Sequence, residues 1–269
     1  MTKKENKRTT KSTQPLLQEV DLDQPVLKAS GWAEVDVKEA PDHKYAITGY
    51  EAQVVTVSLK PGEHCQGEPG SMMYLSPHVE MLASYSGCWD RCCGGESCFV
   101  LNFTNKSSGP GYAALVPSDP LAKVVPVELS SPEVGGCLIV QQGSYMASYG
   151  KVDVGMSCDF NFCRCCCGGM GLIRQKLEGT GTVFLASTGT IVQKVLQAGE
   201  TCVIDTNCLL AYSKSCKFDL KRTGGVVGMF GGGEGIFNST ITGPGLVIMQ
   251  SMNVKLLLES LAAEKMYRR

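Results

Sequence analysis

The chain has 269 residues with a net charge of −1, so no global electrostatic field attracts nucleic acid or anionic lipid. No apolar run approaches the ~20 residues that cross a bilayer, and no secretory signal is present, which predicts a cytoplasmic protein. The 31 Gly and 12 Pro suit a protein with many tight turns better than a helical one.

Residues 1–45 are predicted to form a flexible polar segment. The first 20 residues combine Thr and Ser with five basic residues, Lys3, Lys4, Lys7, Arg8 and Lys11. They offer too little apolar surface to offset the entropy of ordering the chain. A targeting presequence is the alternative, although Glu5 and the lack of an apolar face argue against it.

One pattern occurs three times between residues 46 and 254, which predicts a repeat architecture. Each copy contains a glycine-rich loop and then a Gly-x-Gly turn, and these turns lie at 109–111, 179–181 and 243–245. Pro61-Gly62-Glu63 also matches Ala198-Gly199-Glu200, 137 residues later. We place the three repeats at about 50–118, 124–192 and 193–254.

Short apolar runs bounded by Gly and Pro predict β-strands within each repeat. Residues 54–59 form one such run, and residues 182–186 and 246–250 each follow a Gly-x-Gly turn. We expect a strand pair around each of these turns, with positive φ angles at several of the glycines. Helical periodicity occurs only near the end of the chain, which predicts a short helix over 255–269.

The segments 177–186 (LEGTGTVFLA), 199–200 (GE) and 230–237 (FGGGEGIF) resemble the altered-inheritance-of-mitochondria protein 24 family. The resemblance covers about residues 50–254. It implies an all-β fold related to the tryptophan-RNA-binding attenuator, in which antiparallel sheets stack with pseudo-threefold symmetry. It also implies a protein without established enzymatic activity and with a link to mitochondrial inner-membrane organisation.

The chain departs from this family in its cysteines, of which there are 14. They cluster in two of the three glycine-rich loops, whereas the third loop has Met and Phe. Because the loops are equivalent in the repeat, we expect them at one end of the molecule. The candidate binding or acylation residues are Cys88, Cys92, Cys93, Cys98, Cys163, Cys165, Cys166, Cys167, Met229 and Phe230.

Four interpretations of the cysteine clusters stay open. The cysteines could be small, partly buried residues in a reducing compartment. They could be S-acylated, so that the loops dock on a membrane surface. They could bind zinc or an iron–sulfur cluster, for which the candidate ligands are Cys92, Cys93, Cys163 and Cys166. Structural disulfides are the fourth interpretation.

Other chemistry has little support in the sequence. His64 and Cys65 are neighbours, and neighbours on a strand point to opposite faces. The glycine-rich loops lack the Lys-Ser/Thr of a phosphate-binding loop, and the two Trp are too few for a base-stacking platform.

The prediction is therefore a non-enzymatic structural or adaptor protein without a cofactor. It would act at a membrane surface or in a membrane complex, in the cytoplasm or in mitochondria, and could form a homo-oligomer. It would not bind nucleic acid. The alternative is a metal- or redox-responsive binding protein with zinc as its cofactor.

Overall fold

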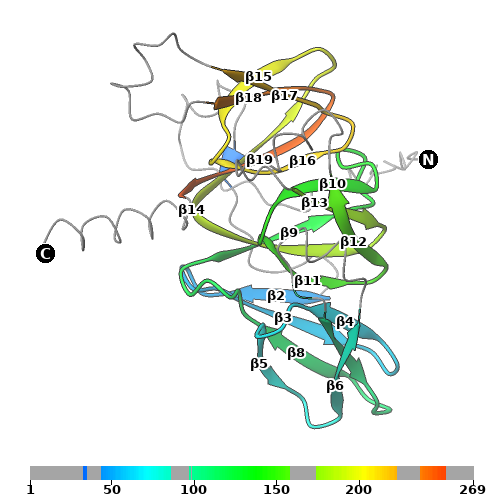
Figure 1. Ribbon diagram of the computed structural model, residues 1–269. Helices are drawn as coiled ribbons and strands as arrows, with labels where there is room; N and C mark the ends of the chain where they lie inside the picture. The colour runs from blue at the N-terminus through cyan, green and yellow to red at the C-terminus, as the bar shows by residue number, and fades with distance from the viewer. Residues whose placement is uncertain are drawn as a thin grey trace, which may run out of the picture.

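The computed structural model describes residues 33–34, 44–85, 97, 99–157, 174–222 and 237–252. Within these residues the chain is all-β, without a helix, and every strand pair is antiparallel (Figure 1). The predicted all-β fold class is thus confirmed. The predicted helix over 255–269 lies outside the described residues, and the repeat boundaries stay predictions.

The first part of the chain contributes to two sheets. One is a four-stranded sheet in the order β2-β3-β8-β5, and the other strands, in the order β4-β7-β6, form one end of a 12-stranded sheet. The four-stranded sheet comprises β2 (Tyr45–Thr48), β3 (Val54–Leu59), β8 (Gly111–Leu115) and β5 (Met72–Leu75). The other three strands are β4 (His64–Gly67), β7 (Phe99–Asn105) and β6 (Val79–Tyr85).

The middle of the chain continues the 12-stranded sheet around one long strand, β14 (Thr182–Leu196). The first half of β14 pairs with β9 and β11, and its second half pairs with β19 and the short β1 (Ala33–Glu34). The remaining strands of this part are β9 (Lys123–Glu128), β10 (Cys137–Gln141), β11 (Tyr145–Tyr149), β12 (Val152–Ser157) and β13 (Arg174–Gly179).

The last part adds a three-stranded sheet in the order β15-β18-β17, while β16 and β19 join the large sheet beside β10 and β14. These strands are β15 (Thr201–Asp205), β16 (Leu209–Ser213), β17 (Lys217–Arg222), β18 (Phe237–Thr242) and β19 (Gly245–Met252). The runs predicted at 54–59, 182–186 and 246–250 fall in β3, β14 and β19, so these strand predictions are confirmed.

The expected strand pairs around the Gly-x-Gly turns are wrong. Among the described residues, β13 pairs with β10 and β12, whereas β14 pairs with other strands. The turns before β8 and β19 also connect strands that do not pair with each other. Each turn is therefore a corner between two sets of strands. Glycine is needed there because a Cβ on Gly179, whose φ is 143°, would collide with the carbonyl oxygen of Lys151.

The two turns matched in the sequence, at 60–63 and 197–200, have the same geometry. In each, the first backbone N–H donates to the glutamate carboxylate at 2.8 Å. In each, the glutamate N–H donates back to the first carbonyl oxygen at 3.0 Å. The φ angles of Gly62 and Gly199 are 78° and 80°. The sequence match thus reflects a shared local structure.

The main core lies between the four-stranded sheet and the middle strands. Its fully buried side chains include Leu59, Phe103, Leu115 and Phe184, and the ring of Tyr45 meets that of Phe184 edge-on at 5.0 Å. A second apolar cluster under the three-stranded sheet is formed by residues such as Ile139, Leu196, Ile204, Leu209 and Val247. Alternation of apolar residues along the strands places them on these inner faces.

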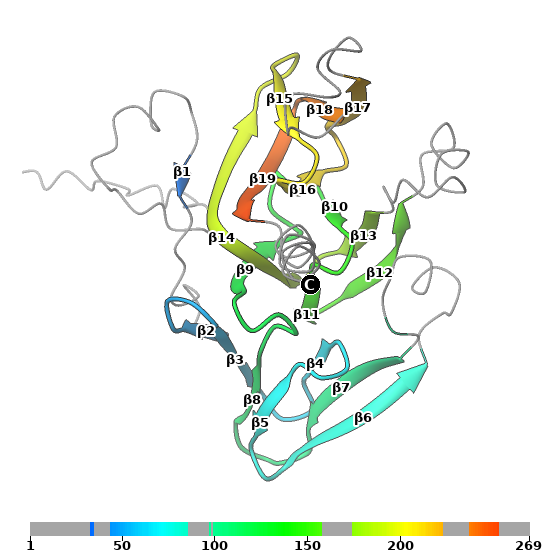
Figure 2. The same cartoon turned by 60° about the vertical axis from the view of Figure 1, so that its left-hand side comes forward.

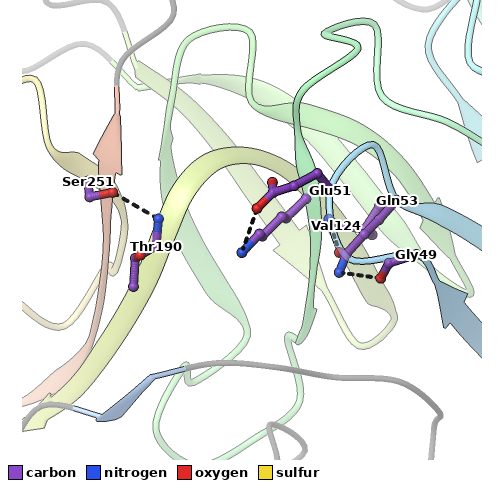
Figure 3. A network of polar contacts seen from close by, with 7 residues as sticks. Gly49, Glu51, Gln53, Val124, Thr190 and Ser251 are labelled. Atoms are coloured by element: carbon purple, nitrogen blue, oxygen red, sulfur yellow. Dashed lines mark hydrogen bonds and ion pairs between the residues drawn. The ribbon is translucent and has the colours of Figure 1, made fainter.

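A polar contact joins the four-stranded sheet to β9 (Figure 3). The buried side chain of Gln53 accepts a hydrogen bond from the Val124 N–H at 2.8 Å and donates one to the Gly49 carbonyl at 3.2 Å. The Lys123–Glu51 ion pair at 3.5 Å lies beside it. Because its amide can donate and accept, one glutamine side chain satisfies backbone groups from two elements.

Candidate functional site

The ten candidate residues of the glycine-rich loops all lie outside the described residues, as do the four candidate metal ligands among them. The strands that carry the loops are described. The first loop connects β6 to β7, the second connects β12 to β13, and the third connects β17 to β18. Each of these strand pairs is antiparallel, so every glycine-rich loop closes a β-hairpin.

One strand of each hairpin lies on the same side of the molecule. Figure 2 shows β6, β12 and β17 on the same, right-hand side of the view. The expectation that the loops themselves gather at one end stays a prediction, because it falls on residues outside the described ranges.

The base of the first loop is an exposed aromatic pair. Tyr85 and Phe99 are directly opposite each other in the last described register of β6 and β7. Their rings meet edge-on at 6.1 Å, and both side chains are more than half exposed. Aromatic pairs of this geometry are usually found in cores or at interfaces.

This pair belongs to a larger apolar surface, which we call the hairpin face and define as Met81, Tyr85 and Phe99. Met81 is opposite Phe103, and alternate residues of a strand share a face. Phe103 is fully buried, whereas Met81 is half-exposed. The core-facing side of the hairpin therefore extends beyond the core into solvent, and contiguous exposed apolar surface is a feature of interaction sites.

The base of the second loop carries a buried cation that contacts two aromatic rings. Arg174, the first described residue after that loop, is buried with its guanidinium 4.9 Å from the ring centroid of Phe218 and 5.7 Å from that of Tyr212. The two rings stack at 5.6 Å. Burial lowers the pKa of Arg174. Cation–π contacts with two rings hold the start of β13 against β16 and β17.

Three of the described cysteines, Cys65, Cys137 and Cys216, are poor nucleophiles. Burial raises the pKa of Cys65 to about 12 and that of Cys216 to about 11. Burial is also the main cause that raises the pKa of Cys137 to about 11. These thiols are therefore protonated at neutral pH, and reactivity requires the thiolate. His64 is exposed and Cys65 is buried on β4, which confirms that they face apart.

The described ranges contain no group of three or more His, Cys, Asp or Glu side chains arranged to hold a metal ion. Over the same ranges, no helix has the length and hydropathy to span a bilayer.

Sequence reasoning missed the hairpin face and Arg174. A partial signal was available for the first, because residues 81, 83 and 85 and residues 99, 101 and 103 are apolar at strand spacing, although Leu82 and Val100 between them are apolar as well. No sequence signal placed Arg174 beside Phe218, since their contact depends on how β13, β16 and β17 are arranged.

A family model, mitochondrial biogenesis AIM24, matches residues 45–252. The chain belongs to this family. It is 28% identical over 214 residues to an uncharacterised protein of Streptococcus pyogenes serotype M6, covering 75% of this chain and 82% of that protein.

Among solved structures, the AIM24 chain is similar to the crystal structure of a Streptococcus pyogenes protein, with a TM-score of 0.61 and 26% identity. The match covers 82% of this chain and 98% of that one. The resemblance stated from the sequence is thus confirmed, and family membership links the chain to mitochondrial biogenesis.

Proposed function

We propose that this AIM24 chain is a non-enzymatic structural or adaptor protein that docks on a membrane surface through its Gly/Cys-rich loops. The observation that carries the proposal is the hairpin face, which exposes Tyr85 and Phe99 at the base of the first loop. The loop between them contains Trp89 and Cys88, Cys92 and Cys93. Aromatic and thiol side chains therefore occur together at one hairpin end.

Two signals would combine in this docking. A Tyr ring favours the interface between headgroups and acyl chains, because its body is apolar and its hydroxyl is polar, and the neighbouring Phe ring adds apolar area. An acyl chain on a loop cysteine would add roughly 0.8 kcal/mol per buried CH₂. Stable anchoring usually requires two such signals. The second loop, with adjacent cysteines at 165–167, could supply another acylation site.

The bacterial relatives support a role that is more general than one organelle. Bacteria have membranes but no mitochondria, so a property shared across the family has to be broader than mitochondrial biogenesis itself. Docking on a membrane surface is such a property. We propose a cytoplasmic location, with mitochondria as the alternative that the family description favours.

We also propose that the scaffold consists of three repeat units with attenuator-like symmetry. The strand pairing supports this division. The sets β3-β8-β5, β9-β14-β11 and β14-β19-β16 share one pattern, in which the middle strand pairs with both others. A second group comprises β4-β7-β6, β10-β13-β12 and β15-β18-β17. In each of these sets the middle strand also pairs with both others, and the glycine-rich loop connects the last two strands. Each unit would contain one set of each kind, with β14 contributing to two units.

The test is a variant in which Cys92, Cys93, Cys165, Cys166 and Cys167 are replaced by Ser. It should lose membrane association on cell fractionation and keep the melting temperature of the wild type, because loop cysteines contribute little packing. The matched control is Cys137→Ser with Cys202→Ser, which changes half-buried cysteines outside the loops. The control should fractionate like the wild type.

Two other outcomes would refute the proposal. Unchanged fractionation of the loop variant would leave the cysteines as small residues in a reducing compartment. A large fall in melting temperature would favour the metal-binding alternative, since structural Zn²⁺ contributes on the order of 10 kcal/mol to folding. Metal analysis and a count of free thiols on reduced protein would then identify the ion.

A further inference from the structure

Among the described residues, β5 pairs only with β8, and β15 pairs only with β18, so each of these strands has an open edge. Their counterparts elsewhere pair on both sides. β11 and β16, the counterparts of β5, pair with β4 and β10, which are the counterparts of β15. The junctions β11-β4 and β16-β10 are therefore of one type. Among the described residues, β5 and β15 are the two strands that would form a third junction of this type, and they do not pair with each other.

The counterparts can be matched residue by residue. A β-bulge interrupts β5 between Met72 and Tyr74, β11 between Tyr145 and Ala147, and β16 between Leu209 and Ala211. The bulges make Tyr74, Ala147 and Ala211 equivalent. On the other side of the junction, Gly67 is opposite Ala147 and Val140 is opposite Ala211. The two internal junctions thus have one register.

On each open edge, an exposed apolar side chain has a buried apolar counterpart at an internal junction. Met73 is 57% exposed, whereas its counterpart Leu210 is fully buried at 0%. Val203 on β15 is 65% exposed, whereas its counterpart Ile139 is 1% exposed. Open edges with exposed apolar residues are templates for pairing with another strand.

We propose that copies of this chain associate head to tail, with β5 of one copy pairing antiparallel with β15 of the next. The internal register places Tyr74 opposite Ile204 and Leu75 opposite Val203. The partner is a second copy because the two edges of one chain lie far apart: Figure 1 shows β15 at the top and β5 at the bottom. A heterologous junction of this kind generates rings or open filaments.

This assembly does not depend on the proposed membrane role. If both hold, each added copy places another set of loops along the assembly. Weak docking by single loops would then be strengthened by multivalency without new contacts.

The test is sedimentation velocity of the full chain over a range of concentrations. The wild type should form dimers and larger species that increase with concentration. Val203→Lys closes the β15 edge and Tyr74→Lys closes the β5 edge, since Lys on an edge strand opposes pairing. Each variant alone should bind itself at least about tenfold more weakly, a change of about 1.4 kcal/mol. Leu121→Lys, an exposed leucine away from both edges, is the control and should behave like the wild type.

Mixing the two edge variants separates head-to-tail pairing from other modes. Each variant keeps one intact edge, so an equimolar mixture should form dimers that do not grow further. A monomeric wild type, undiminished self-association of either variant, or a mixture that stays monomeric would each overturn the proposal. Met73→Lys provides a second β5 variant if Tyr74→Lys lowers the melting temperature.

Discussion

Replacing Gln53 with leucine tests whether the polar contact between the four-stranded sheet and β9 stabilises the fold. Gln53 is 6% exposed and Val124 is 4% exposed, so water has little access to their hydrogen bond. The leucine variant leaves the buried Val124 N–H without its acceptor, which costs about 1–3 kcal/mol. The Gly49 carbonyl lies in an exposed turn and can bind water instead, so its loss adds little.

The expected effect of Gln53→Leu is a loss of about 2 kcal/mol, which lowers Tm by about 4–8 °C in a domain of this size. Thermal and urea unfolding followed by circular dichroism would measure it. Amide hydrogen exchange adds a local readout, because the Val124 N–H should exchange faster in the variant than in the wild type.

Glu51→Gln is the matched control on the same turn. It breaks only the Lys123–Glu51 ion pair, in which the glutamate side chain is 64% exposed. Exposed pairs contribute less than about 1 kcal/mol. The reasoning is refuted if the two variants lose equal stability, or if Gln53→Leu melts like the wild type.

Gly179→Ala should lose at least about 3 kcal/mol of stability, because of its positive φ and the close backbone oxygen. Gly155→Ala, whose Cβ would meet only the Lys176 carbonyl oxygen at an ordinary 4.0 Å, should change the unfolding free energy by less than about 1 kcal/mol. Alkylation at neutral pH should label Cys65 and Cys216 only after unfolding. Burial raises the pKa of Cys65 from 9.0 to about 12 and that of Cys216 from 9.0 to about 11. The thiols of the unfolded chain therefore ionise at lower pH than those of the folded protein, and the unfolding free energy should fall as pH rises above 9.0. Arg174→Lys should lower unfolding free energy by about 1–2 kcal/mol, since an ammonium cannot stack as a planar guanidinium does; equal melts would contradict this.

Periodicity and turn chemistry were sufficient to predict local structure. The strand at Val54–Leu59 alternates in burial as its sequence implies, and the match between Gly62 and Gly199 reflects turns with the same hydrogen bonds. These features depend on neighbours in the chain, so sequence patterns report them.

Features that depend on long-range pairing could not be predicted in the same way. A Gly-x-Gly turn reads as a hairpin signal, but Gly179 is required by the approach of the Lys151 carbonyl from another turn. The hairpin face likewise results from how far the core extends along β6 and β7. Strand spacing in the sequence places Tyr85 on the face of Met81, and Phe99 on the face of Phe103, but it does not show that the core stops short of Tyr85 and Phe99.

The long strand β14 sets the separation between the strands that pair with its two halves. Its 15 residues, at roughly 3.3 Å each, form about 50 Å of continuous backbone. Its first half pairs with β9 and β11 and its second half with β19, so it holds the strands on both sides in one hydrogen-bonded ladder. The second hairpin joins this ladder through β10, β16 and β19, so its place relative to β14 is set by strand pairing. The separation between the strands along the first half of β14 and those along its second half is therefore set by the backbone of one continuous strand.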